Sequence, residues 1–411
     1  MKKIHSGSVH RKSWTSELHF SHNLQRATLI FCLTMACFVA SLIWSKEALA
    51  MDPIRSESQG LVEKPESQTL NQQFNAYTSG GNILAKYTSY LASKKQRSIW
   101  NGDTWKDKAP KEFAACEKTY KKIFADGIMK MNIAFGYSDN FDRTLDAGLY
   151  ELTIDTLTSS CSGQKTACGF QLIQGTSRKA ILEKQIRKPA AIESASQNLK
   201  IRMTIAYSAA NTRDEDNFSG GKISAAQKSA TRVSEQVFFG GIQGIVKNGL
   251  RERCDVCVYY GHARDGGGPD FGPIPYEWRD DEGKTDYSQF HKRRTNYRLL
   301  LDSMEKAQDE APALVAVLAC YSHSHFYNRK ACIDRSAPNC QAKSLASYAA
   351  NSGFILTTDY SWFENFEKTF GTMLDGVLGL KCASAINGNY AGLRGQLDFK
   401  ESYKIYGNFL Q

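Results

Sequence analysis

A histidine and a cysteine, each following an apolar run, have the chemistry of a nucleophile and its base. His262 follows residues 256–260 (VCVYY) after one glycine, and Cys320 directly follows residues 314–319 (LVAVLA). An imidazole beside a thiol favours the reactive thiolate, which attacks acyl carbons, and the same imidazole can protonate the leaving amine. This chemistry requires a fold that brings the two residues to one place. Taken alone, each residue would more simply be a loop histidine or a core or disulfide-bonded cysteine.

The elements around the two residues predict an α/β fold with a mainly parallel sheet and flanking helices. Amphipathic or helical stretches cover residues 224–250, 288–309 and 362–378, and they alternate with apolar runs that are typical of buried parallel strands. In such sheets ligands bind beyond the carboxyl ends of the strands. Neighbouring strands lie about 4.8 Å apart, so adjacent strands would place His262 and Cys320 in one cleft. The four predicted strands are 201–207, 256–260, 314–319 and 354–357.

Polar residues in the same strand-end loops are candidates for substrate binding. Arg264, Asp265 and Asp270 lie on a glycine-rich loop, which can approach a ligand closely. Asp359 and Trp362 follow the fourth predicted strand. Turn capping by the aspartates and core packing of Trp362 are the alternative interpretations, and the sequence leaves both open. No Gly-Lys-Ser/Thr follows the glycines, which argues against a nucleotide phosphate site.

The two strand ends resemble those of the caspase-like superfamily of cysteine peptidases, which includes legumains, gingipains, metacaspases and separases. The matching text is VCVYYGHARDGGG with His262 and LVAVLACYS with Cys320, within residues 195–380. The resemblance implies a His262–Cys320 catalytic dyad and an oxyanion hole made by backbone N–H groups, here those of Ala263 and Cys320. It also implies a peptide or protein substrate and no metal or other cofactor.

Two features depart from that family pattern. The family commonly has Gly directly after the catalytic histidine, whereas this chain has Ala263, with Gly261 in front of the histidine. The family also has a strand between the first strand and the histidine strand, and none is evident in this interval. We expect it either near residues 237–242 or in the segment before residue 195.

Two other functions compete with the peptidase interpretation. His323 and His325 lie close to Cys320, and His262, Asp265 and Asp270 could complete a nitrogen and oxygen site for a metal-dependent hydrolase. Alternatively, the chain could be an envelope interaction module that keeps the fold without its chemistry. A reactive Cys320, a bound zinc ion, or neither would separate the three functions.

The amino-terminal residues indicate export. Basic residues between Lys2 and Arg26 precede an apolar run at 27–44 and the sequence Ala48-Leu49-Ala50, which is the order of a cleavable signal peptide. We therefore expect a periplasmic or extracellular protein with no stable membrane span after cleavage; a retained anchor is the alternative. The expected organisation is a signal peptide at 1–50, a mobile polar lead-in at 51–110, an accessory β-rich segment at 111–194 and the α/β domain at 195–411.

Within the accessory segment, a helical pattern begins near Pro110, and short strands are expected between residues 133 and 155. The alternation of residues 150–154 (YELTI) predicts one half-buried strand, and residues 169–173 predict another.

Cysteine count also bears on chemistry. Nine of the eleven cysteines follow the predicted leader, so in an oxidising compartment four disulfides would leave one thiol. Two pairs flank short polar loops and predict local disulfides: Cys161 with Cys168, and Cys332 with Cys340. Cys254 and Cys257 have the spacing of a redox or metal pair, but disulfide or core roles fit better, because no second such pair exists.

The formal net charge of +10 comes from 52 basic and 42 acidic residues. Part of it lies on the leader, and the remaining basic residues are dispersed among acidic ones, which argues for a solvated mixed surface and not for nucleic-acid binding.

Overall fold

The computed structural model describes residues 110–407 apart from 141–142, 162–165, 188–197, 248–249, 282, 335, 337–338, 362, 394–396 and 398–401. The predicted leader, the lead-in up to residue 109 and Trp362 lie outside the described residues. None of the described helices combines the length and the apolar character that crossing a bilayer requires.

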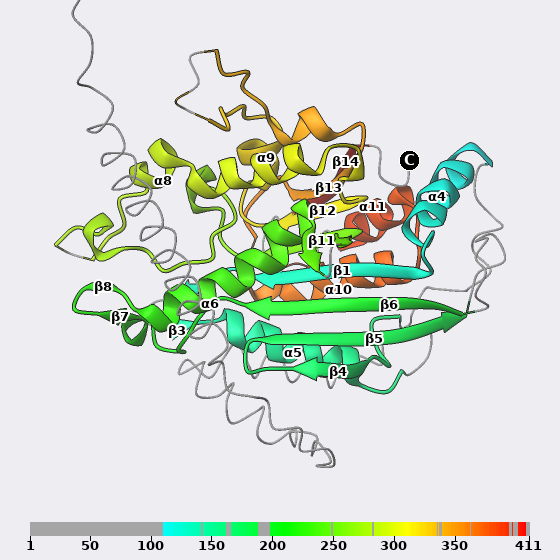
Figure 1. The fold of residues 1–411 in the computed structure, drawn as a ribbon, viewed down its shortest axis with the longest axis horizontal. Coiled ribbons are helices and arrows are strands. Elements are labelled where there is room, and N and C mark those ends of the chain that lie inside the picture. The colour runs from blue at the N-terminus through cyan, green and yellow to red at the C-terminus, as the bar shows by residue number, and fades with distance from the viewer. Residues whose placement is uncertain are drawn as a thin grey trace, which may run out of the picture. The chain divides into compact units, whose positions relative to one another are not determined.

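One mixed sheet of eight strands organises the described residues, in the order β14-β13-β12-β11-β1-β6-β5-β4. The five strands β13, β12, β11, β1 and β6 run parallel to one another, whereas β14 pairs antiparallel with β13, β5 with β6, and β4 with β5 (Figure 1). The α/β fold with a mainly parallel sheet is therefore confirmed. The strands are β1 (Ile128–Phe135), β4 (Gln171–Gly175), β5 (Lys179–Arg187), β6 (Asn198–Tyr207), β11 (Val256–Tyr260), β12 (Leu314–Leu318), β13 (Gly353–Thr357) and β14 (Tyr403–Gly407).

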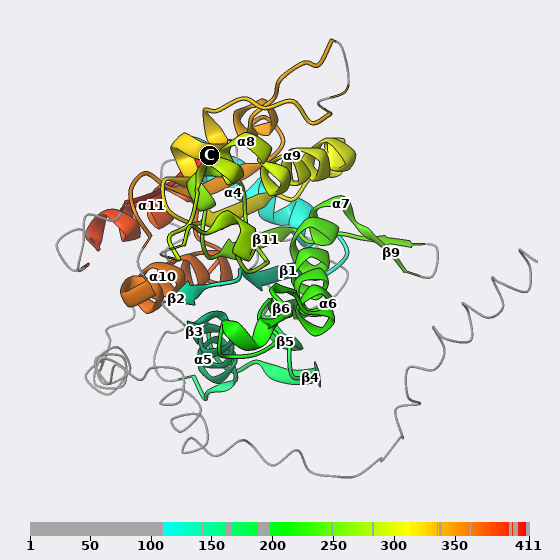
Figure 2. The same ribbon diagram turned by 90° about the vertical axis from the view of Figure 1, so that its left-hand side faces the viewer.

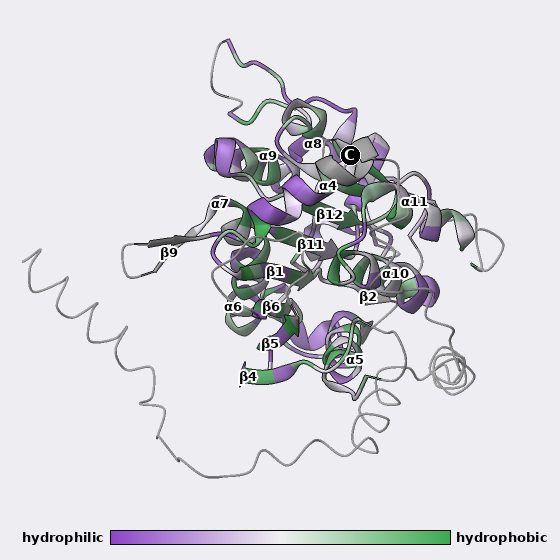
Figure 3. Ribbon diagram, turned by 90° about the vertical axis from the view of Figure 1, so that its right-hand side faces the viewer, coloured by the Kyte–Doolittle hydropathy of each residue, from purple (hydrophilic) through white to green (hydrophobic). Residues whose placement is uncertain are grey.

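Helices cover both faces of this sheet, which explains why β11, β12 and β13 are buried along their whole length. Figure 2 shows α5, α10 and α11 on one face and α6, α7 and α9 on the other. Helix α9 buries one side and exposes the other, as the alternating hydropathy in Figure 3 illustrates. The helices are α4 (Pro110–Ile123), α5 (Asp146–Thr158), α6 (Ala225–Glu235), α7 (Gly241–Gln243), α8 (Ser288–Arg293), α9 (Thr295–Ala307), α10 (Phe366–Leu378) and α11 (Ala383–Gly392).

Three small hairpins complete the regular structure. They are formed by β2 (Asp139–Asn140) with β3 (Arg143–Thr144), β7 (Phe218–Ser219) with β8 (Lys222–Ile223), and β9 (Ile245–Lys247) with β10 (Leu250–Glu252). The first two lie in the connections after β1 and β6, and therefore near the carboxyl ends of parallel strands (Figure 1).

The segment before residue 195 supplies a strand that lies beside the histidine strand. β1 (Ile128–Phe135) lies between β6 and β11 and pairs in parallel with both. Residues 237–242, the other expected location, form π-helical and α-helical turns. The segment 111–194 thus contributes β1, β4 and β5 to the same sheet.

One predicted strand is wrong. Residues 150–154 lie inside helix α5, whose buried side chains include Leu149, Tyr150, Thr153 and Leu157. The helix places Leu149 and Leu157 in the core against the sheet. This tertiary packing outweighs the short alternation of polar and apolar residues that favoured a strand. The strand expected at 169–173 is found as β4, shifted by two residues.

Four disulfides join eight of the nine cysteines that follow the predicted leader. Cys161–Cys168 and Cys332–Cys340 confirm the two predicted local pairs. Cys116–Cys382 joins α4 to the start of α11, and Cys254–Cys257 joins the residue two positions before β11 to the second residue of that strand. Disulfides persist in oxidising compartments, so these pairs agree with an exported protein. Cys320 belongs to none of them and carries a thiol.

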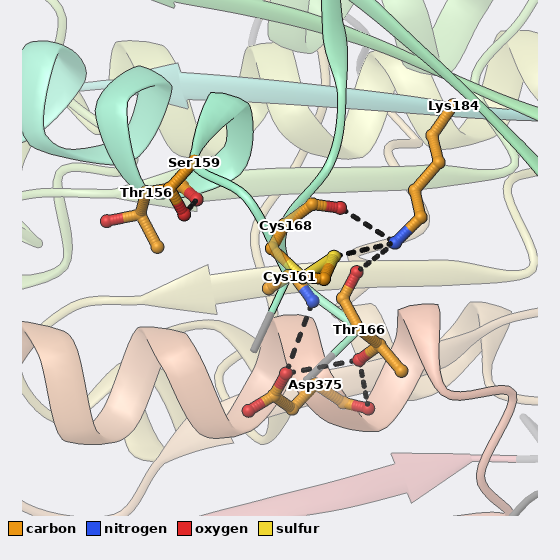
Figure 4. The surroundings of a disulfide bond; sticks show 8 residues. Thr156, Ser159, Cys161, Thr166, Cys168, Lys184 and Asp375 are labelled. Atoms are coloured by element: carbon orange, nitrogen blue, oxygen red, sulfur yellow. Dashed lines mark hydrogen bonds between the residues drawn. A yellow bond between two sulfur atoms is a disulfide. The ribbon is translucent and has the colours of Figure 1, made fainter. Parts of the chain in front are cut away.

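The Cys161–Cys168 loop also has polar attachments to two other elements (Figure 4). Asp375 of α10 accepts hydrogen bonds from the Thr166 hydroxyl at 3.1 Å and the Ala167 amide at 3.4 Å. Lys184 of β5 donates to the carbonyls of Thr166 and Cys168 at 3.0 and 2.7 Å. The loop is therefore held both covalently and by a carboxylate and an ammonium from opposite sides.

Candidate active site

The two chemically competent side chains leave adjacent strands at matching positions. β11 and β12 pair with Tyr260 opposite Leu318, and beyond this pair the Gly261 amide donates to the Leu318 carbonyl at 3.3 Å. His262 and Cys320 each lie two residues beyond that pair. Because side chains alternate between sheet faces, both positions continue the row of Tyr260 and Leu318, which belongs to the core on the α10 side.

A short segment between β13 and α10 contacts both side chains. The Ser361 amide donates to the Cys320 Sγ at 3.4 Å, and the Ser361 carbonyl oxygen lies 3.6 Å from the same sulfur. The His262 imidazole meets the Phe363 ring edge to face, with 5.6 Å between the ring centroids. An N–H directed at sulfur stabilises a thiolate, and a carbonyl accepts from a thiol, so Ser361 suits both protonation states.

The backbone turns sharply directly after Cys320. Tyr321 has a φ of 49°, which is uncommon for a residue other than glycine. Its amide donates to the Asp359 carbonyl at 2.8 Å, and the next residue, Ser322, places its hydroxyl 3.0 Å from that of Thr357 at the end of β13. Contacts to the neighbouring strand therefore hold a conformation that would otherwise be unfavourable, and this turn orients the thiol.

The glycine-rich loop after His262 is equally constrained. Arg264 and Asp265 have φ values of 44° and 48°. Gly268 has a φ of 125°, and a Cβ there would lie 2.1 Å from the Tyr297 amide nitrogen, so only glycine fits. This loop is consequently packed against the start of α9.

The three predicted substrate-binding residues of this loop have different environments. Arg264 and Asp270 form a buried ion pair, with 2.8 Å between Nε and Oδ2 and side chains 3% and 10% exposed. Asp265 is half exposed and lies 3.8 Å from the Nδ1 of His291. The structure therefore brings Arg264 to Asp270 and separates both from bulk solvent, while Asp265 remains accessible.

The remaining predicted site residues are partly placed. The Asp359 carboxylate accepts from the Tyr360 amide at 2.8 Å, a local contact in the loop after β13. The carbonyl of Ala263, a residue 3% exposed, accepts from the amides of Gly266 and Gly268. Trp362 lies outside the described residues, but its neighbours Ser361 and Phe363 make the contacts with the thiol and the imidazole.

The two histidines considered for a metal site point to different surroundings. His323 stacks on Tyr406 with 4.3 Å between ring centroids, and also on Tyr327. His325 lies against the glycine-rich loop at Gly266, and burial lowers the pKa of both imidazoles. Across the part of the chain that the structure describes, no three His, Cys, Asp or Glu side chains gather in a group suited to holding a metal ion.

A buried polar cluster at the ends of β1 and β6 was not anticipated from the sequence. The Asp146 carboxylate is fully buried and accepts from the amides of Ser208 and Ala209 at 3.0 and 2.6 Å. Burial raises its pKa from 3.8 to about 7, against the lowering effect of these hydrogen bonds. Nearby, Asp214 accepts from Tyr137 and Arg279. The only sequence signal was polar residues after the first predicted strand.

Sequence reasoning also missed Ser361 and Phe363, because a serine and a phenylalanine in a short loop carry no chemical signature of their own. Comparison of this chain with protein-family models, with curated proteins and with solved structures gives no match.

Proposed function

We propose that this protein is an exported cysteine hydrolase, most simply an endopeptidase, with Cys320 as nucleophile and His262 as general acid and base. The observation that carries the proposal is the register of β11 and β12, which puts the two residues at corresponding positions beyond adjacent parallel strands. The contacts of Cys320 with Ser361 and of His262 with Phe363 support the same arrangement. A periplasmic or extracellular location follows from the predicted leader and the four disulfides.

The reaction would proceed in two steps. The Cys320 thiolate attacks the carbonyl carbon of a peptide bond, the C–N bond breaks, and His262 gives a proton to the departing amine. A water molecule then attacks the thioester, transfers a proton to His262 and releases the acid and the thiolate. The backbone N–H groups of Ala263 and Cys320 are the proposed donors to the oxyanion in both steps.

Two further observations support the proposal. Cys320 is the described cysteine that stays out of the four disulfides, as a nucleophile must. The position of β1 between β6 and β11 also supplies the strand that the caspase-like resemblance requires before the histidine strand. The resemblance itself remains the basis for choosing peptide bonds among acyl substrates.

Iodoacetamide labelling of the purified chain without reductant, followed by mass mapping, tests the nucleophile. We expect selective modification of Cys320, slowed about ten-fold or more in His262→Ala because the imidazole no longer favours the thiolate. His323→Ala is the matched control, since this histidine is three residues from Cys320 but stacks on tyrosines; its labelling rate should stay within about two-fold of wild type.

Hydrolysis is tested with a diverse peptide mixture, by detecting new termini with mass spectrometry. Cys320→Ser should lower the rate by a factor of about 10³ or more, since it removes the nucleophilic sulfur. A Cys320 that reacts only after unfolding would overturn the proposal. Selective labelling without any new termini would contradict hydrolysis and favour the non-catalytic module.

A further inference from the structure

A cavity of about 160 Å³ lies between the glycine-rich loop and the start of α9. Its wall includes Arg264, two residues after His262, as well as the loop before α8 and the end of α8. Tyr297, beside this cavity, belongs to the core on the α9 side of the sheet, whereas His262 and Cys320 continue the row on the α10 side. The cavity is therefore a feature separate from the thiol and its contacts.

Positive charge dominates the cavity wall. Three arginines, Arg264, Arg293 and Arg294, and one acidic residue, Asp270, are among the residues that line it. Asp270 is engaged by Arg264 at 2.8 Å and by the Asn296 side chain at 3.4 Å. The one acidic side chain in the wall is thus held by Arg264 and Asn296, and the wall contains more basic than acidic side chains.

The other two arginines of the wall are held in place by contacts with neighbouring residues. Arg293 lies over the ring of Trp278, with 4.9 Å from its Cζ to the ring centroid. Arg294 donates from Nε to the His291 carbonyl at 3.1 Å, and it also occupies the N-cap position of α9. The helix dipole adds to the positive potential here, because α9 begins at the cavity with Thr295.

The wall also has an apolar part. Trp278 and Phe290 meet edge to face with 4.8 Å between ring centroids, and Pro273 and Pro275 extend the same surface. The volume is close to that of a cavity that holds one benzene molecule, about 150 Å³. A ligand of this shape has a short apolar body and an anionic end, because bare inorganic anions make no use of aromatic and proline walls.

We propose that this cavity binds a carboxylate carried on a short apolar stem, such as the side chain of glutamate. The guanidinium fork matches a carboxylate in geometry and charge, and the stem packs against the wall that Trp278 and Phe290 form together. The inference goes beyond the proposed hydrolase and does not depend on it, since binding here requires no reaction at Cys320. The source is either a free small acid or an acidic residue of a polypeptide.

Isothermal titration calorimetry at low salt tests the site with N-acetyl-glutamate amide, and with a peptide of alanines around one central glutamate. N-acetyl-glutamine amide and the matching glutamine peptide are the neutral controls. We expect at least one glutamate probe to bind about ten-fold or more tightly than its glutamine counterpart. Tighter binding of the peptide than of the blocked amino acid would identify a polypeptide source, and the reverse a small acid.

Two variants on α8 assign the binding to the cavity. Arg293→Gln removes a charge from the wall and should weaken glutamate binding about ten-fold, whereas Lys292→Gln removes the same charge one residue away, outside the wall, and should change it less than two-fold. Equal affinity for glutamate and glutamine probes, or equal losses in both variants, would overturn the proposal. Because no turnover is measured, a failed hydrolase assay leaves this outcome unaffected.

Discussion

The cysteines at the two ends of the parallel strands differ in their bonding. At the amino ends, a disulfide links Cys254 to Cys257 at the start of β11. A second one links Cys382 to Cys116 of α4, the helix that leads into β1 (Figure 1). At the carboxyl ends, Cys320 keeps its thiol directly after β12. The amino ends are held by disulfides, and the carboxyl ends keep a cysteine thiol.

The backbone follows the same division. Three of the non-glycine residues with positive φ, Arg264, Asp265 and Tyr321, lie within three residues of His262 or Cys320 at the carboxyl ends of β11 and β12. Unfavourable conformations of this kind are retained where surrounding structure enforces them, and they are frequent at functional sites. Disulfides therefore lie at the amino ends of the sheet, whereas the unfavourable backbone conformations lie around the candidate site at its carboxyl ends.

Among the changes that test this comparison, removal of the long-range disulfide should cause the largest loss of stability. Cys116 and Cys382 are 266 residues apart in sequence and nearly fully buried. The double variant Cys116→Ala/Cys382→Ala should lower the free energy of unfolding by about 3–5 kcal/mol, measured by urea denaturation, since a long loop is released and core contacts are lost.

Cys332→Ala/Cys340→Ala is the matched control, because its loop spans only 8 residues. Its loss of stability should be about half as large or less. Cys320 labelling in both folded variants should keep the wild-type rate. If the long-range variant slowed the labelling of Cys320 while still folded, the two ends would not be independent, and the division would fail.

Much of this fold follows from local sequence, because buried parallel strands such as 256–260 and 314–319 are apolar along their whole length. β1 was harder to recognise, since Lys130 and Asn132 interrupt its apolar residues and a glycine follows it. Its place in the sheet depends on pairing with β6 and β11, which are distant in sequence. Residues 150–154 were misread for the same reason, because the face that they cover is set by tertiary packing.

The next largest effect should be a pH dependence of stability. It comes from Asp146, in the polar cluster at the carboxyl ends of β1 and β6. Burial raises the pKa of Asp146 to about 7 from 3.8, so the folded state keeps a proton that the unfolded state releases. Stability from this group is complete below about pH 4 and is lost as the pH rises through 7. Asp146→Asn should therefore gain stability relative to wild type between pH 4 and pH 8, on the order of 2–4 kcal/mol.

Urea denaturation of both proteins at several pH values measures this difference. Burial also raises the pKa of Asp255 to about 7, but this residue is present in both proteins, so its contribution cancels. Asparagine retains an oxygen that accepts from the amides of Ser208 and Ala209. A pH-independent difference between the two proteins would show that Asp146 is ionised in the folded state.

The candidate site was predictable only where residue type carries the chemistry. His262 and Cys320 were found because imidazole and thiol are rare and follow strands. Ser361 acts through its backbone amide and carbonyl, which every residue type except proline provides. The Arg264–Asp270 ion pair depends on a loop turn with positive φ, so the sequence named both residues but not their contact.

The smallest predicted effect concerns the Cys161–Cys168 loop. It tests whether the polar contacts of the loop stabilise the fold in addition to the disulfide. Asp375→Ala removes the acceptor for Thr166 and Ala167 and should cost about 1 kcal/mol in the free energy of unfolding. Asp375→Asn retains an acceptor oxygen and should cost less than half of that. Hydrogen exchange of the Ala167 amide gives the local readout, with faster exchange expected in the alanine variant.

The pair of variants also separates hydrogen bonding from charge. Burial lowers the pKa of the nearby Lys184 amino group, and the negative charge of Asp375 opposes this effect. If the asparagine variant were destabilised as much as the alanine variant, the attraction between Asp375 and Lys184 would hold the loop, and not the two hydrogen bonds. Added salt would then lower the stability of the loop, because salt screens the attraction between Asp375 and Lys184. The salt dependence of unfolding in wild type therefore decides whether this attraction or the two hydrogen bonds hold the loop.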